Sequence, residues 1–319
     1  MKKIVLFLSL FINLFANNLV DLYREEGLLA VENKLEESLQ TEEYWNKYLE
    51  DKNIDYGYYE TKKYLILTQK KSSELYLIKK ENNNFKVISK NTIISGENEG
   101  DKYSEGDKKT PEGVYELTSK KTKLDPFYGP LALVTSYPNT FDKALDKKGH
   151  GIWIHGMPIN KEREKFTKGC IALDNLNLQE LDKEIDLKSA ILLTSKGEFQ
   201  KTNKKEIVQI LTTIYKWKDS WKKSDSTKYL QFYSKLFKKS DGSDFEKFAS
   251  FKKRVFAKAE KKRIKFSNID ISPYPNSLNK KMFKVMMDEE YKSPSVQFQG
   301  KKELFLEIID NKVEILAEG

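Results

Sequence analysis

Two stretches of sequence carry most of the information about this fold: Gly149-His150-Gly151-Ile152-Trp153-Ile154-His155-Gly156 and Thr167-Lys168-Gly169-Cys170-Ile171-Ala172-Leu173. Each contains a short apolar run next to glycine, which is the pattern of a short β-strand. We expect strands at Gly151–His155 and Ile171–Leu173. His155 ends the first of them and Cys170 directly precedes the second, so two chemically reactive side chains lie at strand ends.

Similar short runs lie on both sides of these two segments. Turn-forming residues separate some of them at Lys70–Ser73 and Asn82–Asn84. One helix is expected at Leu178–Ile185, with Asn177 as its cap. Many short strands with few helices predict a mainly-β domain, a β-sandwich or a barrel, over residues 56–197. The other expected strands are Tyr64–Thr68, Glu74–Ile78, Phe85–Ile88, Gly113–Thr118, Leu131–Thr135 and Ala190–Thr194.

The sequence changes character after Gly197. Aromatic residues at helical spacing predict three helices, and strand-like runs follow them. Helices followed by an antiparallel meander predict a second, α+β domain over residues 203–319. The expected helices are Lys205–Trp221, Thr227–Phe237 and Asp244–Lys262, and the expected strands are Ile264–Ile271, Met282–Met287, Ser295–Gln299, Leu304–Ile308 and Val313–Leu316.

The N-terminus has the features of an export signal. Met1-Lys2-Lys3 supplies positive charge, Ile4–Phe15 is a short apolar run, and Ala16 follows it. These features predict a signal peptide over residues 1–16 and export to the periplasm. An uncleaved anchor is the alternative, because Leu14 fits a cleavage site poorly. The run is too short for a comfortable transmembrane helix, so we expect no stable membrane span.

The acidic segment over residues 17–55 is predicted to be a helical unit. Apolar residues recur at helical spacing over Leu19–Leu39, and Tyr44, Trp45 and Tyr48 indicate a second short helix. A unit of this size cannot hold a hydrophobic core of its own. We therefore expect it to pack on the main domain or to join two protomers in a homodimer.

The charge balance bears on the partners of the protein. The chain has 319 residues, with 57 Lys and Arg against 48 Asp and Glu, a net charge of +9. The lysine surplus of the second domain suits acidic stem peptides or glycans, and a solvated surface is the alternative. Since export removes the protein from nucleic acid, we expect no nucleic-acid partner despite the charge.

Cys170 is the sole cysteine, and the two histidines, His150 and His155, both lie shortly before it. An exported chain with one cysteine forms no internal disulfide, so the thiol is either reactive or a buried small hydrophobe. A cysteine nucleophile needs an imidazole that takes its proton and later protonates the leaving amine. The clustering of these residues favours a catalytic Cys170, whose N–H would form an oxyanion hole with that of Gly169.

The spacing of the two histidines distinguishes them. Side chains alternate between the faces of a regular strand, so His150 and His155 point in opposite directions. His155 shares a face with Trp153 and lies beside Gly156 at the strand end, where we expect the catalytic base. His150 is expected in a loop, as a structural residue or in the substrate groove. One cysteine and two diverging histidines offer no metal-ligand spacing, so neither a metal nor a cofactor is expected.

These motifs resemble the L,D-transpeptidase (YkuD) catalytic domain, whose signature is His-Gly followed by Ser/Thr-x-Gly-Cys. Two further elements of that family precede the signature in this chain, in the same order as in the family. They are Thr110-Pro111-Glu112-Gly113-Val114-Tyr115 and Tyr137-Pro138-Asn139-Thr140-Phe141-Asp142. The resemblance covers about residues 56–197.

The resemblance implies that Cys170 is the nucleophile, that His155 is the general base, and that the Gly156 carbonyl orients the imidazole. This chain departs from the family at Lys168, where histidine is usual, and at Ala172, where arginine is usual. The charge of Lys168 would favour the neighbouring thiolate or meet a substrate carboxylate, and a solvated lysine is the alternative. The residues expected to contact substrate are His150, Trp153, Thr167 and Lys168.

The whole layout resembles the cell-shape peptidoglycan L,D-carboxypeptidases of helical ε-proteobacteria, the relatives of Campylobacter and Helicobacter. In those proteins the last domain is NTF2-like, a cone of helices against a curved sheet. The resemblance implies removal of the terminal D-Ala from peptidoglycan tetrapeptide stems through a thioacyl-enzyme on Cys170. Two alternatives stay open: an L,D-transpeptidase that forms 3–3 cross-links or exchanges D-amino acids, and a non-catalytic scaffold that binds the wall.

Overall fold

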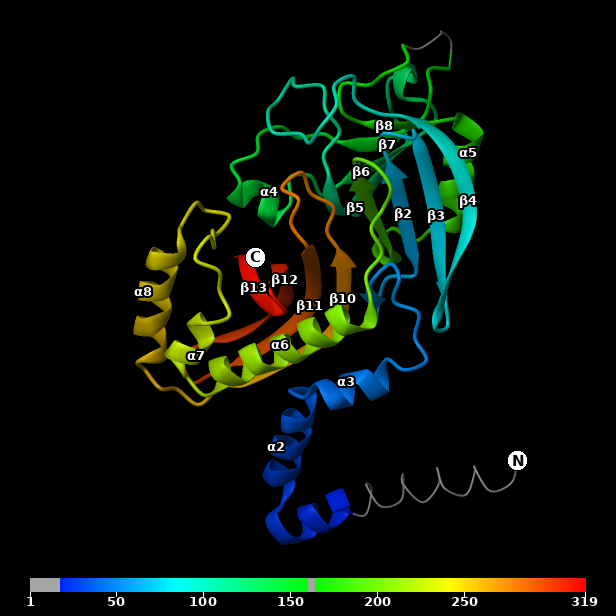
Figure 1. Ribbon diagram of the computed structural model, residues 1–319. Helices are drawn as coiled ribbons and strands as arrows, with labels where there is room; N and C mark the ends of the chain where they lie inside the picture. Colours follow the sequence, from blue (N-terminus) through cyan, green and yellow to red (C-terminus); the bar gives the residue numbers. More distant parts are fainter. Residues whose placement is uncertain (1–17, 160–163) are drawn as a thin grey trace, which may run out of the picture.

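The computed structural model describes residues 18–159 and 164–319. Its strands form a closed eight-stranded barrel and a five-stranded sheet, with helices packed outside them (Figure 1). The predicted combination of a mainly-β domain and an α+β domain is confirmed. The barrel strands are β2 (Tyr64–Gln69), β3 (Glu74–Glu81), β4 (Asn84–Ile94), β5 (Gly113–Lys121), β6 (Ala132–Thr135), β7 (Trp153–His155), β8 (Ile171–Leu173) and β9 (Ala190–Ser195).

The barrel closes in the order β2-β3-β4-β8-β7-β6-β5-β9. Its inward-facing side chains include Ile66, Ile154 and Ile171, all at most 1% exposed. Helix α5 (Asn175–Glu184) packs on this same core through Leu178 and Leu181. The predicted cap of that helix is wrong, because the carboxylate of Asp174 accepts the N–H groups of Leu176 and Asn177 and starts the helix earlier.

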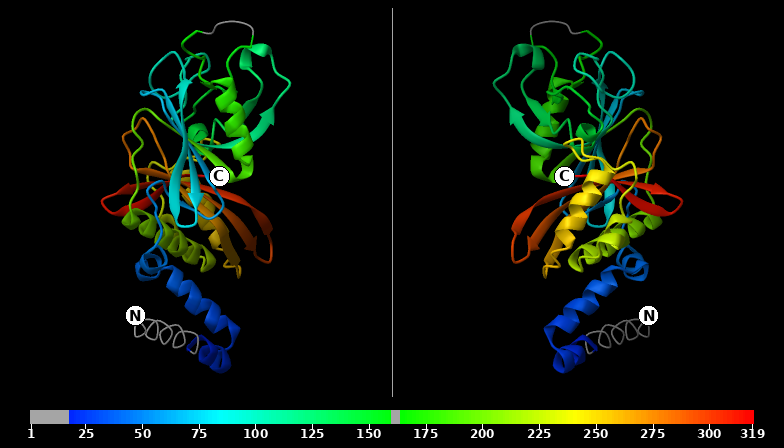
Figure 2. Two further views of the ribbon diagram at one scale, coloured as in Figure 1. Left: turned by 90° about the vertical axis from the view of Figure 1, so that its right-hand side faces the viewer. Right: turned by 90° about the vertical axis from the view of Figure 1, so that its left-hand side faces the viewer.

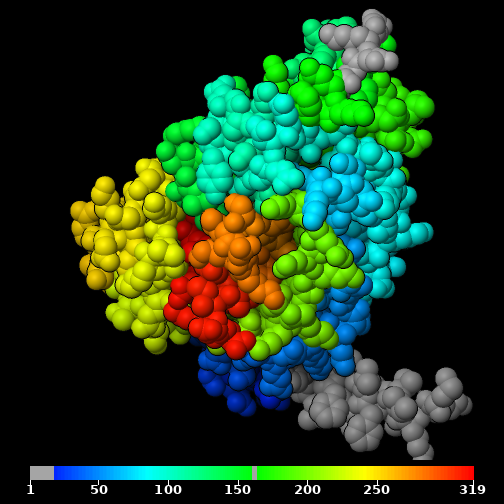
Figure 3. Space-filling view, turned by 45° about the horizontal axis from the view of Figure 1, so that its top comes forward, coloured from blue at the N-terminus to red at the C-terminus, as the bar shows by residue number. Residues whose placement is uncertain are grey.

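The second sheet is the middle layer of the molecule. Its strands are β1 (Tyr58–Tyr59), β10 (Arg263–Pro273), β11 (Met282–Lys292), β12 (Gln297–Ile309) and β13 (Lys312–Glu318), in that order and all antiparallel. Because side chains alternate along a strand, Phe283 and Val285 join the cluster formed with the helices, whereas Met282 and Met286 join the cluster formed with the barrel. The space-filling view shows the orange part of this sheet directly against the cyan part of the barrel domain (Figure 3).

This layering explains the continuous apolar run in β9. Ile191 and Leu193 face the second sheet, while Ala190 and Leu192 face the barrel interior. Every residue of β9 is therefore buried. A strand covered on both faces loses the alternation of polar and apolar residues that marks a half-exposed strand.

Three helices cover the far face of the second sheet: α6 (Lys204–Lys222), α7 (Ser226–Leu230) and α8 (Phe245–Phe256). The predicted helix over Thr227–Phe237 is wrong beyond Leu230, where the chain follows the free edge of β13 instead. The Ser234 N–H donates to the Ile315 carbonyl at 3.0 Å, and the Ile315 N–H donates to Phe232 at 2.8 Å. The open edge offers these backbone groups partners that a helix would otherwise supply.

Other predicted elements differ in extent. The two strands expected at Ser295–Gln299 and Leu304–Ile308 are one strand, β12, because it pairs with β11 along its length. The strand predicted at Phe85–Ile88 continues to Ile94, where it reaches β8. Helix α4 (Thr140–Ala144) and strand β1 were not expected. Since β1 pairs with β10, the barrel itself begins at Tyr64.

The N-terminal unit extends from the body on the side of α6 (Figure 2). Gly27, with φ of 85°, interrupts the single helix predicted over Leu19–Leu39, and α2 (Leu28–Leu39) and α3 (Glu42–Tyr48) follow it. Trp45 and Leu49 are buried in the cluster that includes α6, so α3 packs on the main body. The predicted signal peptide lies outside the described residues, among which no helix is long and apolar enough to span a bilayer.

Candidate active site

Strands β7 and β8 place His155 and Cys170 on the same face of the barrel wall. The two strands are parallel and adjacent, with Ile154 opposite Ile171 and His155 opposite Ala172. Ile154 and Ile171 point into the barrel core, so His155 and Ala172 point outward. Cys170 precedes Ala172 by two residues and therefore lies on this outer face, one strand away from His155. The structure thus brings together the two residues that the sequence singled out.

The imidazole of His155 is completely buried and is fixed by its neighbours. Its Nδ1 lies 2.7 Å from the carbonyl oxygen of Gly156. Because a carbonyl oxygen only accepts, this contact requires the proton on Nδ1 and leaves Nε2 as the basic nitrogen. The ring of Tyr128 packs edge-on against the imidazole, with centroids 5.1 Å apart. The tautomer and the plane of the ring are therefore both determined by local contacts.

The Gly156 carbonyl is held in turn by Asn175, the first residue of α5. Asn175 Oδ1 accepts the N–H of Met157 at 2.8 Å, and its Nδ2 donates to the Met157 carbonyl at 3.1 Å. A side chain at residue 156 would collide with Asn175 Oδ1. The Gly156 N–H donates to Tyr128 at 2.9 Å. Asn175 and Tyr128 thus support the backbone that faces His155, and sequence reasoning missed both, because each is distant from the His-Gly pair along the chain.

Thr167 shapes the turn that presents Cys170. Its side chain is buried, donates to the Cys170 carbonyl at 2.7 Å and accepts the Gly169 N–H at 3.0 Å. This placement argues for a structural role of Thr167 and not for the predicted contact with substrate. Thr167 also accepts the Gly169 N–H within the turn, so this N–H, which the sequence predicted for an oxyanion hole, already has a partner. The Sγ of Cys170 lies 3.5 Å from the Gly151 carbonyl oxygen.

Gly169 is required by the loop that packs behind it. Its φ is 129°, and a Cβ at this position would lie 2.7 Å from the carbonyl oxygen of Lys109. The same loop is anchored by Thr110, whose buried hydroxyl accepts the Gly96 N–H at 2.8 Å. The Thr-Pro element of the sequence therefore supports the cysteine turn from behind.

A buried ion cluster connects this loop with the Tyr-Pro element. Lys147 Nζ lies 2.7 Å from Asp101 and 2.8 Å from Asp142, and all three side chains are buried. Burial alone would lower the pKa of Lys147, but the two carboxylates raise it. Asp142 also forms a capping box with Asn139 at the start of α4, and Asp101 accepts the Glu112 N–H at 2.8 Å. The cluster therefore joins two of the sequence motifs into one support.

The other predicted substrate residues lie around this centre. His150 is in the loop before β7, exposed, with Nε2 at 3.9 Å from Glu105 Oε1, too long for a hydrogen bond. Lys168 is exposed in the turn before Cys170. Trp153 shares the outer face of β7 with His155, and the Lys121 ammonium lies 5.6 Å from the centroid of its ring. Among the described residues, no group of three or more His, Cys, Asp or Glu side chains is arranged to hold a metal ion.

A barrel with a histidine on the outer face of one strand and a cysteine directly before the neighbouring strand agrees with the family comparisons. Residues 63–193 match the L,D-transpeptidase catalytic domain, and residues 209–319 match the Cds6 C-terminal NTF2-like domain. The structure is also similar to that of the helical cell shape determining protein Pgp2 from Campylobacter jejuni. The two are 40% identical, over 88% of this chain and 100% of that one, with a TM-score of 0.83.

A point mutant of Pgp2 gives a TM-score of 0.85 at 40% identity, covering 88% of this chain and 99% of that one. Bd1075 from Bdellovibrio bacteriovorus is 26% identical over 81% of this chain and 92% of its own, with a TM-score of 0.63. No curated protein sequence matches this chain. The chain belongs to the YkuD L,D-transpeptidase family, in the group of Pgp2-like proteins that carry a C-terminal NTF2-like domain.

Proposed function

We propose that this protein is a peptidoglycan L,D-carboxypeptidase that removes the terminal D-Ala from tetrapeptide stems and thereby shapes the cell wall. The observation that carries the proposal is the His155 imidazole, oriented by the Gly156 carbonyl at 2.7 Å, on the same barrel face as Cys170. Family membership supplies the substrate class, and the similarity to Pgp2 supports the role in cell shape. Such a substrate places the protein in the periplasm.

The mechanism follows from the tautomer of His155. Its Nε2 takes the proton of the Cys170 thiol, and the thiolate attacks the carbonyl carbon at the L-centre of the third stem residue, meso-diaminopimelate. The oxyanion that forms is stabilised by the N–H of Cys170. Its collapse breaks the peptide bond, and His155 returns the proton to the amine of D-Ala, which leaves. Water, deprotonated by His155, then cleaves the thioester and releases the tripeptide.

The runner-up is L,D-transpeptidation, in which an amine instead of water attacks the same thioester. It gives 3–3 cross-links or exchanged D-amino acids, and it uses the same Cys170 and His155. A third candidate is a wall-binding scaffold without catalysis, which the lysine-rich C-terminal domain keeps open.

The test is digestion of purified tetrapeptide muropeptides, followed by separation and mass analysis of the products. We expect tripeptide and free D-Ala from the natural chain. Cys170→Ala should lower the rate at least about 10³-fold, because the nucleophile is lost. His155→Asn should lower it at least about 10²-fold, whereas the matched change His150→Asn should cost less than about tenfold. Cross-linked products would favour the transpeptidase, and turnover that survives Cys170→Ala would exclude the cysteine mechanism.

A further inference from the structure

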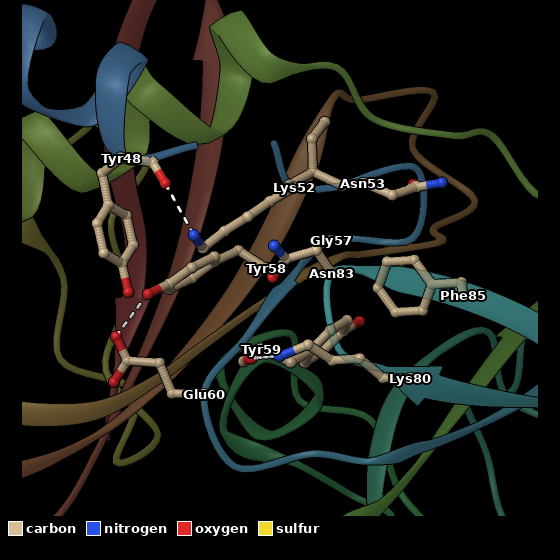
Figure 4. Close-up of a pocket in the computed structure, with 11 residues that line it drawn as sticks. Tyr48, Lys52, Asn53, Gly57, Tyr58, Tyr59, Glu60, Lys80, Asn83 and Phe85 are labelled. Carbon is tan, nitrogen blue, oxygen red and sulfur yellow. Dashed lines mark hydrogen bonds between the residues drawn. The ribbon is translucent and has the colours of Figure 1, made fainter. Parts of the chain in front are cut away.

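A second site lies where three parts of the chain meet. The end of α3, the segment around β1 and the β3–β4 hairpin enclose a cavity of about 270 Å³ (Figure 4). It is remote from Cys170. The 11-residue strand β4 begins beside the cavity and ends at Ile94, which pairs with Ala172. At about 3.3 Å per residue, the two sites are separated by about 30 Å, so a ligand in the cavity cannot also reach the thiol.

Aromatic rings form the walls of this cavity. Tyr48 and Phe85 lie on opposite sides of it, with Tyr58 between them (Figure 4). Tyr58 is 5% exposed, and its hydroxyl donates to Glu60 Oε1 at 2.7 Å, which holds the ring in place. Tyr48 remains 39% exposed despite its position at the cavity. Rings fixed at their buried side and open at the other offer a ligand a flat apolar surface.

Two lysines give the cavity its positive charge. Lys52 lies over the ring of Tyr48, at 4.3 Å from the centroid, and donates to the Tyr48 carbonyl at 2.9 Å. Its ammonium also pairs with Asp51, which is 71% exposed, at 3.4 Å, so the charge of Lys52 is partly balanced at the mouth of the cavity. Lys80 is half-buried and donates to the carbonyl of Tyr59. Burial lowers the pKa of Lys80, against a smaller effect of Asp270 and Glu60. Within residues 18–159 and 164–319, no carboxylate lies at ion-pair distance from the Lys80 ammonium.

The acidic groups nearby are already engaged. Glu60 accepts the Tyr58 hydroxyl with one oxygen and the Ile269 N–H, at 2.7 Å, with the other. Asp270 accepts the N–H groups of Glu60 and Thr61, each at 2.9 Å. The Lys80 ammonium is partly desolvated and forms no ion pair with these carboxylates, so it is a suitable partner for a carboxylate that arrives with a ligand.

We propose that this cavity binds a carboxylate-bearing segment of a peptidoglycan stem peptide, with the carboxylate on Lys80 and Lys52 and the apolar part of the peptide against Tyr48 and Phe85. The volume admits the end of a ligand and not a whole muropeptide. The inference rests on the proposed function for the identity of the polymer. A second contact about 30 Å from Cys170 holds a stem other than the one being cleaved, and it raises the effective concentration of substrate at the thiol.

The experiment measures binding without turnover. Full-length protein carrying Cys170→Ala is titrated with purified tetrapeptide muropeptide in a calorimeter. In a second assay, the same protein is co-sedimented with insoluble peptidoglycan. Adding Lys80→Met or Tyr48→Ala should lower the apparent affinity for peptidoglycan in co-sedimentation by about tenfold, because a charge-assisted hydrogen bond or an aromatic contact is lost. Lys80→Arg should restore it. Each variant is checked for an unchanged melting temperature.

The matched control is Lys79→Met. Lys79 neighbours Lys80 on β3 but points to the opposite face, where it pairs with Glu184 at 3.4 Å. We expect this variant to bind as its parent does. Co-sedimentation that is unchanged in Lys80→Met and in Tyr48→Ala would overturn the proposal, as would an equal loss in Lys79→Met. The outcome is independent of the carboxypeptidase assignment, because Lys80→Met with Cys170 intact should cleave a short soluble tetrapeptide at the parent rate.

Discussion

At the scale of single residues, the candidate active site depends on side chains that perform no chemistry. His155 is fixed by a backbone carbonyl, and that carbonyl is fixed by an amide side chain that begins the next helix. The amide of Asn175 bonds both the N–H and the C=O of Met157, so it restrains the backbone on the far side of Gly156. Asn175 is therefore a positioning residue that acts through Gly156.

We expect Asn175→Ala to lower kcat on tetrapeptide by about 10-fold to 10²-fold, because a misplaced base loses much of its contribution. Asn175→Asp keeps the acceptor for the Met157 N–H but loses the donor, so it should recover part of the rate. The pH dependence of iodoacetamide alkylation of Cys170 should also shift in Asn175→Ala, since the thiolate depends on the position of the imidazole. The rate of alkylation at each pH is measured by quenching the reaction at set times and quantifying the modified protein by mass spectrometry.

The control for this prediction is Gln179→Ala, an exposed residue on the same helix. If Asn175→Ala lowers the stability of the protein but leaves the pH profile of Cys170 alkylation unchanged, then Asn175 has only a structural role.

At the scale of elements, the loop over residues 101–109 supports the cysteine turn and is itself built around one carboxylate. Asp107 accepts the Lys102 ammonium at 2.6 Å and the N–H groups of Tyr103, Ser104 and Lys109 at 2.9 to 3.0 Å. Burial alone would raise the pKa of Asp107, but these donors lower it to about 2. The carbonyl of Lys109 then packs against Gly169.

We expect Asp107→Asn to lower the free energy of unfolding by about 1–2 kcal/mol at pH 7, because the donors around Asp107 stabilise its ionised side chain in the folded state and are lost on unfolding. Because the pKa of Asp107 is lower in the folded protein, its ionised side chain contributes its full stability above pH 3.8, the ordinary pKa of the group. This contribution is lost as the pH falls towards about 2. Chemical denaturation of both proteins at pH 7, 4 and 2.5 should show the difference shrinking over this range. Asp146→Asn, at an 84% exposed carboxylate, should change stability little at any of these values. A constant difference across the range would contradict the assignment.

At the scale of the whole molecule, the N-terminal unit leaves an apolar surface uncovered. No side chain of α2 is buried. The large exposed apolar residues of this unit include Val20, Tyr23, Leu28, Leu29 and Leu35, with exposures of 49% to 70%. We propose, as the sequence indicated, that this surface joins two protomers, because a helix gains stability chiefly by covering its apolar face.

In sedimentation velocity, the chain from residue 18 onwards should therefore behave as a dimer at micromolar concentration. The double change Leu28→Glu and Leu29→Glu should convert it to a monomer, because charges at these positions resist burial. Lys34→Glu, an exposed polar position on the same helix, should leave the dimer intact. A natural chain that is monomeric at every concentration would contradict this proposal. Removing residues 18–50 would be a poorer test, because Trp45 and Leu49 belong to the main core.

The sequence by itself predicted where the barrel strands lie and singled out His155 and Cys170 as the candidate catalytic pair. The sequence signals for these features are local, because β7 and β8 are short apolar runs next to glycine and because His155 and Cys170 belong to family motifs. Local periodicity specifies strand or helix because neighbouring side chains must share a face. The same periodicity predicted both ends of α6 to within one residue.

Only the tertiary structure decided which distant segments meet. Tyr58–Tyr59 becomes a strand because the edge of β10 pairs with it, and residues beyond Leu230 leave the helix because the edge of β13 is open. Asn175 and Tyr128 join His155, and Lys80 joins Tyr48, from separate elements. Backbone hydrogen bonds at a free edge and contacts across layers depend on what lies opposite in space, and sequence spacing does not encode this.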